Sequence, residues 1–392
     1  MGKRMLWLAA LTLLAAPLAA QDRIDGNIED MVIKGSPIFQ KEGKLELGQD
    51  RTGFGLDWTV LSIGIDDNVL NVDRHKETSG FLDSVAAAFF GVNLGLVEVG
   101  VRGNAAGRIL FDADNDILFQ LNAGGFVRKQ ARKGGEIGFG VSADLVWQEP
   151  TYYELTGPIL RFDKVRRGAI VGRAHFAYAA TDYFGLELGV FGSNSDFSEE
   201  NLDTSADYWE IGFDFGLWMR FWEFLQIKPY IRGEYDWFRD AFDQNDDGSF
   251  SGEDKLQLLK GKLAVEIRTR IGSLFGMVAN VYLRRQDDSA QGFQRYWQYG
   301  FDAAALFNIV MVRVTVGVKG WSREYTDAVD FNDIGEGETT FERLFGIWAE
   351  VRANVIWKLY VGVRADFDRR ASDFDNRGYA NGQYQLFAGL SF

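Results

Sequence analysis

Apolar residues recur at every second position through most of the chain, from residue 53 to its end. The clearest example is the stretch 310–319, where valines alternate with basic and small residues at Val310, Val312, Val314, Val316 and Val318. Successive side chains of a strand point to opposite faces, so such a segment has one apolar and one polar face. A period of two indicates strands, because an amphipathic helix would repeat every 3.6 residues.

The alternating segments are about 10 to 18 residues long. Strands of soluble proteins usually have about five or six residues, whereas a tilted strand that crosses a bilayer needs about ten. We therefore predict an all-β fold, a transmembrane, antiparallel, up-and-down β-barrel of about 16 strands, or of 14 if two of the first four strands are not separate. The predicted strands are 54–66, 82–93, 96–108, 115–129, 136–148, 166–180, 184–196, 207–221, 225–239, 257–272, 276–287, 294–308, 310–323, 341–356, 358–370 and 382–392.

Short and long connections alternate between these strands. Tight turns are expected around Thr181 to Tyr183 and at Asn308 and Ile309, whereas 196–207 and 327–338 are long and rich in acidic residues. Short turns on one rim and long loops on the other are typical of membrane barrels. An even number of strands places both ends of the barrel on the rim of short turns.

The last ten residues form one alternating strand, with one face made of Tyr384, Leu386, Ala388, Leu390 and Phe392. An edge strand leaves backbone groups unpaired unless it closes a barrel, and closure is compulsory in lipid. This pattern resembles the C-terminal signature of bacterial outer-membrane β-barrels. The resemblance implies an outer-membrane location, membrane lipid around the wall, and the barrel-assembly machinery as the partner of the last strand. The sequence leaves open whether the chain forms a homo-oligomer.

The N-terminal segment differs from the rest of the chain. Residues 1–20 are predicted to be a signal peptide, because Lys3 and Arg4 precede an apolar run that is too short to span a bilayer. Residues 21–52 are polar and are expected to form a periplasmic arm or a hatch-like segment before the barrel at 53–392. Without the signal, the formal net charge of −14 becomes −14 − 2 = −16. Such an acidic chain is not expected to bind nucleic acid.

Charged residues recur on the polar face of one strand after another. Charges are costly in a dry core, so we expect this face to line a hydrated lumen. Opposed basic and acidic residues of this kind resemble those of general diffusion porins, which implies an outer-membrane channel for passive diffusion of small hydrophilic solutes. The predicted pore-lining residues are Arg102, Arg173, Arg232, Glu234, Glu266, Arg268, Arg270, Arg284, Arg313, Lys319, Glu350, Arg352, Arg364 and Asp366.

One acidic loop, 243–254, resembles an EF-hand calcium loop. Gly248 stands at the position of the sharp turn, and Asp254 replaces the usual bidentate glutamate. The resemblance implies a Ca2+ ion that stiffens a surface loop, and the alternative is a solvated acidic hairpin. The metal ligands would be Asp243, Asn245, Asp247, Ser249, Ser251 and Asp254.

Two other functions stay open beside the porin. One is a closed barrel whose calcium-ordered acidic loops act in adhesion or envelope structure. The other is a substrate-specific outer-membrane transporter for hydrophobic compounds. An enzyme is not expected, because the chain has no cysteine and two histidines, His75 and His175, and no nucleophile can be identified near His175.

Overall fold

The structure is a computed structural model, and its description covers most of the chain beyond the N-terminal segment. The described residues are 53–66, 78–111, 117–129, 134–153, 163–198, 207–222, 224–244, 250–272, 274–288, 295–325, 340–356, 359–373 and 378–391. In these ranges every regular element is a strand, and no helix is long and apolar enough to span a membrane. The predicted signal peptide and the segment 21–52 lie outside them.

Sixteen strands are formed by the described residues. They are β1 (Gly53–Asp66), β2 (Ser79–Asn93), β3 (Glu98–Leu110), β4 (Ile117–Lys129), β5 (Ile137–Tyr153), β6 (Asp163–Ala179), β7 (Phe184–Ser198), β8 (Tyr208–Phe221), β9 (Leu225–Gln244), β10 (Phe250–Ile271), β11 (Phe275–Asp288), β12 (Tyr296–Ile309), β13 (Val312–Tyr325), β14 (Thr340–Ile356), β15 (Leu359–Ser372) and β16 (Tyr379–Ser391).

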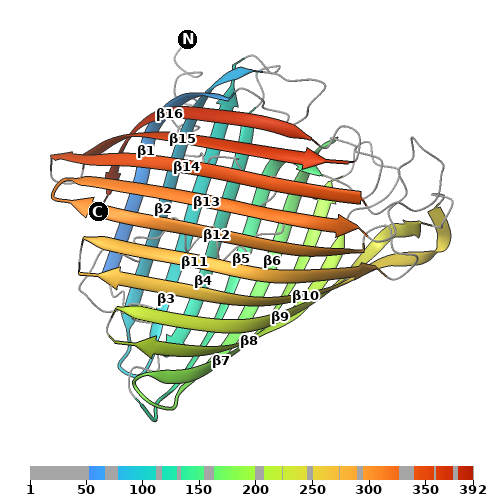
Figure 1. Cartoon of the computed structure of the whole chain (residues 1–392), viewed down its shortest axis with the longest axis horizontal. Coiled ribbons are helices and arrows are strands. Elements are labelled where there is room, and N and C mark those ends of the chain that lie inside the picture. Colours follow the sequence, from blue (N-terminus) through green and yellow to red (C-terminus); the bar gives the residue numbers. More distant parts are fainter. Residues whose placement is uncertain are drawn as a thin grey trace.

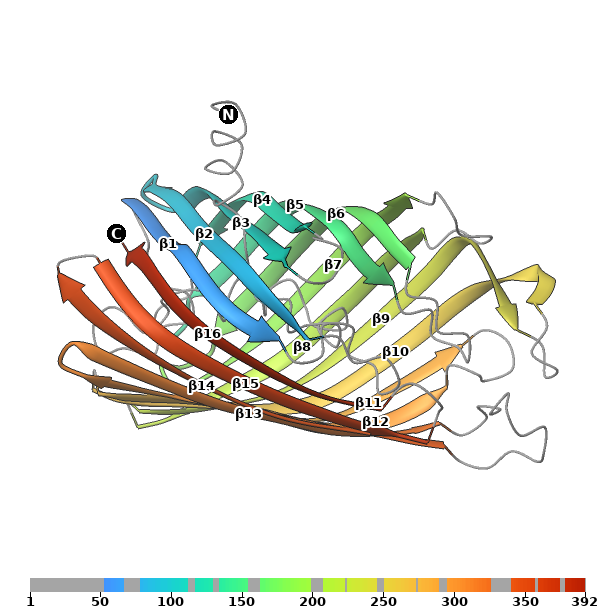
Figure 2. The same ribbon diagram turned by 90° about the horizontal axis from the view of Figure 1, so that it is seen from above.

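The strands form one closed antiparallel barrel in which each strand pairs with its neighbours in sequence (Figure 1). Closure comes from β1 and β16, whose register runs from Asp57 opposite Ser391 to Asp66 opposite Gln383. Figure 2 shows these two strands side by side, with the start of β1 beside the end of β16. The predicted 16-stranded up-and-down barrel is therefore confirmed, and the alternative of 14 strands is wrong.

The two rims of the barrel differ as the sequence predicts. Two or three residues join β8 to β9, β10 to β11 and β12 to β13 on one rim, here called the turn rim. The opposite rim, the loop rim, carries longer connections such as 326–339 between β13 and β14. Both ends of the barrel wall lie on the turn rim, whereas the β9–β10 hairpin projects from the loop rim (Figure 1).

Several predicted boundaries differ from the observed ones by a few residues, and two of the differences have a clear physical reason. The turn between β12 and β13 is formed by Val310 and Met311, after the predicted position at Asn308 and Ile309, so the predicted strand 310–323 begins only at Val312. Val310 continues the alternating pattern, and the pattern therefore hides the reversal of the chain. The second error concerns residues 240–256, because β9 and β10 extend well into this expected loop, with shifts of register around Lys255.

The two faces of the wall have opposite character. Large apolar side chains are exposed on one face in all parts of the barrel, for example Leu263, Val316 and Val363. The other face carries the charged residues and is more buried, with Asp236 and Glu342 almost inaccessible. In a closed barrel the more enclosed face is the inner one. The chain therefore has an apolar outer surface and a charged inner wall.

Candidate functional site

The inner wall holds all the residues that the sequence predicts to line a pore. The strand registers place each of the fourteen on the face opposite the exposed apolar side chains. Eight of the sixteen strands contribute them: β3, β6, β9, β10, β11, β13, β14 and β15. The charges thus extend over most of the circumference, with the majority between β9 and β15.

Three ion pairs on this wall join strands that are two apart in the barrel: Arg102 with Asp144, Lys228 with Glu187, and Lys319 with Asp368. The Arg102 guanidinium donates to Asp144 at 2.6 and 3.0 Å, and Nζ of Lys319 lies 2.9 Å from Asp368. Each pair crosses the strand between its partners, namely β4, β8 and β14. The charged groups therefore lie along the wall.

A glycine on the crossed strand makes room for each pair. A Cβ atom at Gly124 would collide with the Asp144 carboxylate, and one at Gly216 would lie 2.8 Å from Cε of Lys228. Gly346 has the same role under Lys319 and Asp368. Contacts this close are essentially never seen for Cβ atoms, so a side chain at any of these positions would displace the charged side chain that lies over it.

Replacing Gly346 with valine is expected to break the ion pair between Lys319 and Asp368. Overpacking of this kind costs about 1–3 kcal/mol, which should appear as a lower urea midpoint of unfolding from lipid vesicles. The displaced side chains should also lower the conductance of any pore. Gly261→Val is the matched control, because a Cβ there meets nothing within 4 Å. Equal effects of the two variants would contradict this role of Gly346.

Other ion pairs also neutralise the wall locally. Arg268 and Glu266 on β10 lie 2.6 Å apart, and Arg364 and Asp366 on β15 lie 2.7 Å apart. Arg232 and Glu234 on β9 form a third pair with the same spacing of two residues. In each of these three pairs, neighbours of opposite sign on one strand face neutralise each other locally. Strong preference for cations or anions does not follow from such an arrangement.

In one row of the inner wall, residues of like charge face each other across neighbouring strands. Cross-strand register places Arg232 of β9 opposite Lys262 of β10, and Lys262 opposite Arg284 of β11. Like charges directly opposite each other are unfavourable in a sheet. Lys262 also lies over aromatic rings, 4.7 Å from the ring centre of Tyr282 and 5.7 Å from that of Tyr230. This cationic row runs across three strands, and the sequence alone does not reveal it because it depends on register.

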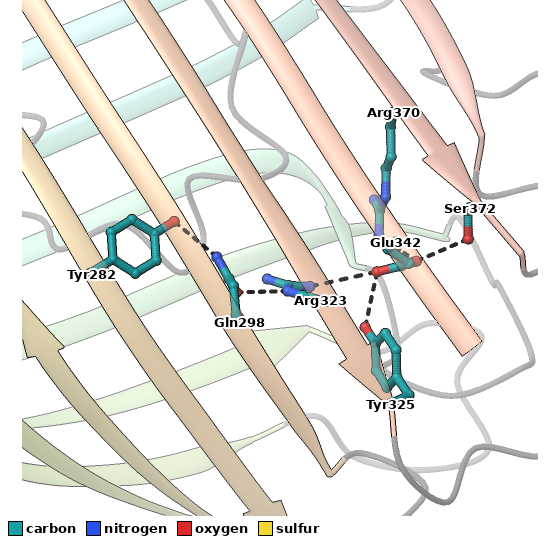
Figure 3. A network of polar contacts seen from close by, with 7 residues as sticks. All are labelled: Tyr282, Gln298, Arg323, Tyr325, Glu342, Arg370 and Ser372. Carbon is teal, nitrogen blue, oxygen red and sulfur yellow. Dashed lines mark hydrogen bonds and ion pairs between the residues drawn. The ribbon is translucent and has the colours of Figure 1, made fainter. Parts of the chain in front are cut away.

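A buried polar network lies at the loop-rim end of β11 to β15 (Figure 3). Its centre is Glu342, which is 0% exposed and accepts hydrogen bonds from Tyr325 at 3.0 Å, Arg370 at 2.9 Å and Ser372 at 3.3 Å. Arg323 lies 3.9 Å from the same carboxylate and donates to Gln298 at 2.8 Å. Gln298 in turn donates to the Tyr282 hydroxyl of β11 at 2.9 Å, so the network joins five neighbouring strands, β11 to β15.

The guanidinium groups of this region also stack on aromatic rings. Arg323 of β13 lies 4.5 Å from the ring centre of Trp321 on the same strand. Arg370 of β15 lies 5.6 Å from the centre of the same ring. Nearer the turn rim, Arg352 lies 3.4 Å from the ring centre of Tyr360. Cation–π contacts hold the planar groups flat against the wall. The inner wall between β13 and β15 is therefore tightly packed as well as charged.

The predicted calcium site lies largely outside the described residues. Asn245, Asp247 and Ser249 fall in the undescribed stretch 245–249, and Asp243, Ser251 and Asp254 belong to the ends of β9 and β10 without described side chains. Among the described residues no group of carboxylates or histidines could hold a metal ion. The calcium loop therefore stays a prediction. His175, the other residue considered for chemistry, packs over Gly140 on the inner wall.

Comparison with known proteins gives matches at the level of structure. No protein-family model matches the sequence, and no curated protein is significantly similar to it. CdiB from Acinetobacter baumannii aligns with a TM-score of 0.45 and 9% identity, over 88% of this chain and 61% of that protein. OmpT of Vibrio cholerae gives 0.42 and 11%, over 88% and 100% of the two chains. OprD of Pseudomonas aeruginosa gives 0.42 and 12%, over 90% and 99%.

Proposed function

We propose that the chain is a porin-like channel of the bacterial outer membrane, through which small hydrophilic solutes diffuse passively. One observation carries the proposal: a single closed wall has exposed apolar side chains outside and charged side chains inside. An apolar outer surface on every side suits lipid, and in lipid only a closed sheet satisfies its own backbone. Barrels of about 16 strands are wide enough to leave an aqueous channel.

The paired charges favour weak selectivity. Solutes would pass a wall on which many charges have a neighbour of opposite sign, and in the row of Arg232, Lys262 and Arg284 residues of like charge lie opposite each other on three strands. The closed-barrel alternative would need groups that bridge the interior. Within the described residues, strands in extensive contact are always neighbours in the barrel, and no described strand runs through the interior.

Conductance of the purified full-length chain in planar bilayers tests the channel. Ohmic single-channel steps are expected, together with entry of small uncharged sugars into vesicles that contain the protein. Ion selectivity, measured in a salt gradient, should be weak because the wall charges are paired. Silent membranes would contradict the proposal if the protein is shown by protease protection to have inserted. Calcium binding, recognition of the last strand by the assembly machinery and oligomerisation stay separate predictions.

A further inference from the structure

Four hairpins of the turn rim have apolar tips, which is unusual for tight turns. These tips are residues 94–97, 222–224, 272–274 and 310–311. Their exposed side chains include Val310 at 98%, Leu96 at 79%, Trp222 at 67% and Leu274 at 65%. Turns normally carry Gly, Asn, Asp, Ser or Pro, each for a conformational reason. The sequence of these four tips contains one charged residue, Glu223, between Trp222 and Phe224.

Backbone conformation makes two of these residues more unusual. Trp222 has a φ of 56° and Val310 a φ of 52°, the left-handed region that L-residues with large side chains avoid. The β10–β11 turn serves as an internal comparison, because it has the same three-residue length and places Gly272 at φ 56° in the first position. The same turn geometry is thus compatible with glycine. Trp222 and Val310 thus occupy positions that conformation and exposure both disfavour for large apolar side chains.

The apolar tips continue the outer surface of the barrel. Phe221, the last residue of β8, is exposed on the outer face, and the rings of Trp222 and Phe224 stack at 5.5 Å immediately beyond it. Ile309 is likewise exposed on the outer face beside Val310. No polar collar separates the wall from these tips. Because these tips continue the apolar outer wall, they favour contact with the same medium as the wall.

We propose that the exposed apolar side chains of these four hairpin tips reach the acyl chains of the leaflet that faces the turn rim, while the backbone of the turns stays in the headgroup layer. The lipid contact of the barrel then extends beyond the ends of the strands and around the tips of the turns. Transfer of tryptophan and large aliphatic side chains from water to the membrane interface is favourable. This favourable free energy offsets the cost of the left-handed backbone conformation. The inference rests on the proposed location in a membrane, and it adds which surface beyond the wall binds lipid.

Single cysteines provide the test, because the chain has none of its own. Val310→Cys and Leu274→Cys are labelled with bimane and reconstituted in phosphatidylcholine vesicles. Lipids brominated along the acyl chains should remove more than half of the bimane emission, whereas iodide in the water should have little effect. Asp182→Cys is the control on the same rim, since Asp182 is exposed in a polar turn. Its label should respond to iodide and not to brominated lipid.

Val316→Cys separates the two proposals. Val316 lies on the outer face of β13, within the strand and beyond the turn at Val310 and Met311, so its label reports whether the wall itself is in lipid. Quenching of Val316 by brominated lipid, with Val310 and Leu274 quenched by iodide, would overturn the insertion of the turns and leave the membrane location intact. A Val316 label that escapes brominated lipid would refute the membrane location. Equal quenching of Asp182 and Val310 by brominated lipid would also overturn the inference.

Discussion

Val316→Arg is expected to destabilise the barrel in lipid by about 2–4 kcal/mol. Val316 points outward from β13, between Ala305 of β12 and Ala349 of β14, so the new guanidinium has no acidic neighbour in register. Lipid cannot solvate the charge at this depth. The free energy of unfolding in urea, measured from vesicles, should fall by this amount, and heat-modifiable migration on gels should show less folded protein.

Thr315→Arg is the matched control for this substitution. Thr315 is the adjacent residue of β13 on the inner face, and it lies opposite Glu350. An arginine at this position meets water and a carboxylate, so the free energy of unfolding should change little. In addition, the extra positive charge should shift the selectivity of the pore towards anions. Should Thr315→Arg prove as destabilising as Val316→Arg, the assignment of the two faces would be wrong.

Glu342→Ala is expected to cost about 3–5 kcal/mol of stability, the largest effect among the inner-wall substitutions considered. The change removes the acceptor of three hydrogen bonds and leaves Arg323 and Arg370, both buried, without that carboxylate. Urea unfolding from vesicles would measure the loss. Hydrogen exchange should report faster exchange of backbone amides at the loop-rim ends of β13, β14 and β15.

Glu324→Ala is the corresponding control on the outer face. Its carboxylate also accepts a tyrosine hydroxyl, from Tyr299 at 3.1 Å, but this pair is exposed to solvent. Exposed contacts contribute about 0–1 kcal/mol, so a small change is expected. If Glu342→Ala and Glu324→Ala have similar small effects, the buried network does not stabilise the barrel as we infer.

Most of the fold could be predicted from the sequence because side chains of a strand alternate with a fixed period. The sixteen strands, the antiparallel order and the two kinds of rim all follow from that alternation and from the spacing of the connections. Val310 shows the limit of this reasoning. Its apolar side chain fits the pattern of the following strand, and only the register between Ile309 and Val312 reveals that it lies in the turn.

The candidate site could be predicted only in part. Strand parity identifies which charges face inward, and it could also have identified Arg323, Glu342 and Arg370, which the prediction omits. Contacts between strands cannot be predicted from parity, because they depend on register and on the tilt of the strands. For this reason the sequence does not show that Arg102 reaches Asp144 across Gly124, or that Arg232, Lys262 and Arg284 form one row.

The ion pairs that skip a strand have a mechanical consequence. Hydrogen bonds between adjacent strands act like hinges, and a ring of hinges can flatten into an ellipse at constant perimeter. Braces from β3 to β5, β7 to β9 and β13 to β15 fix the angle at the strand between them. The cross-section should therefore keep its shape when the bilayer is compressed laterally, and the size limit for solutes would be set by the wall instead of by the surrounding lipid.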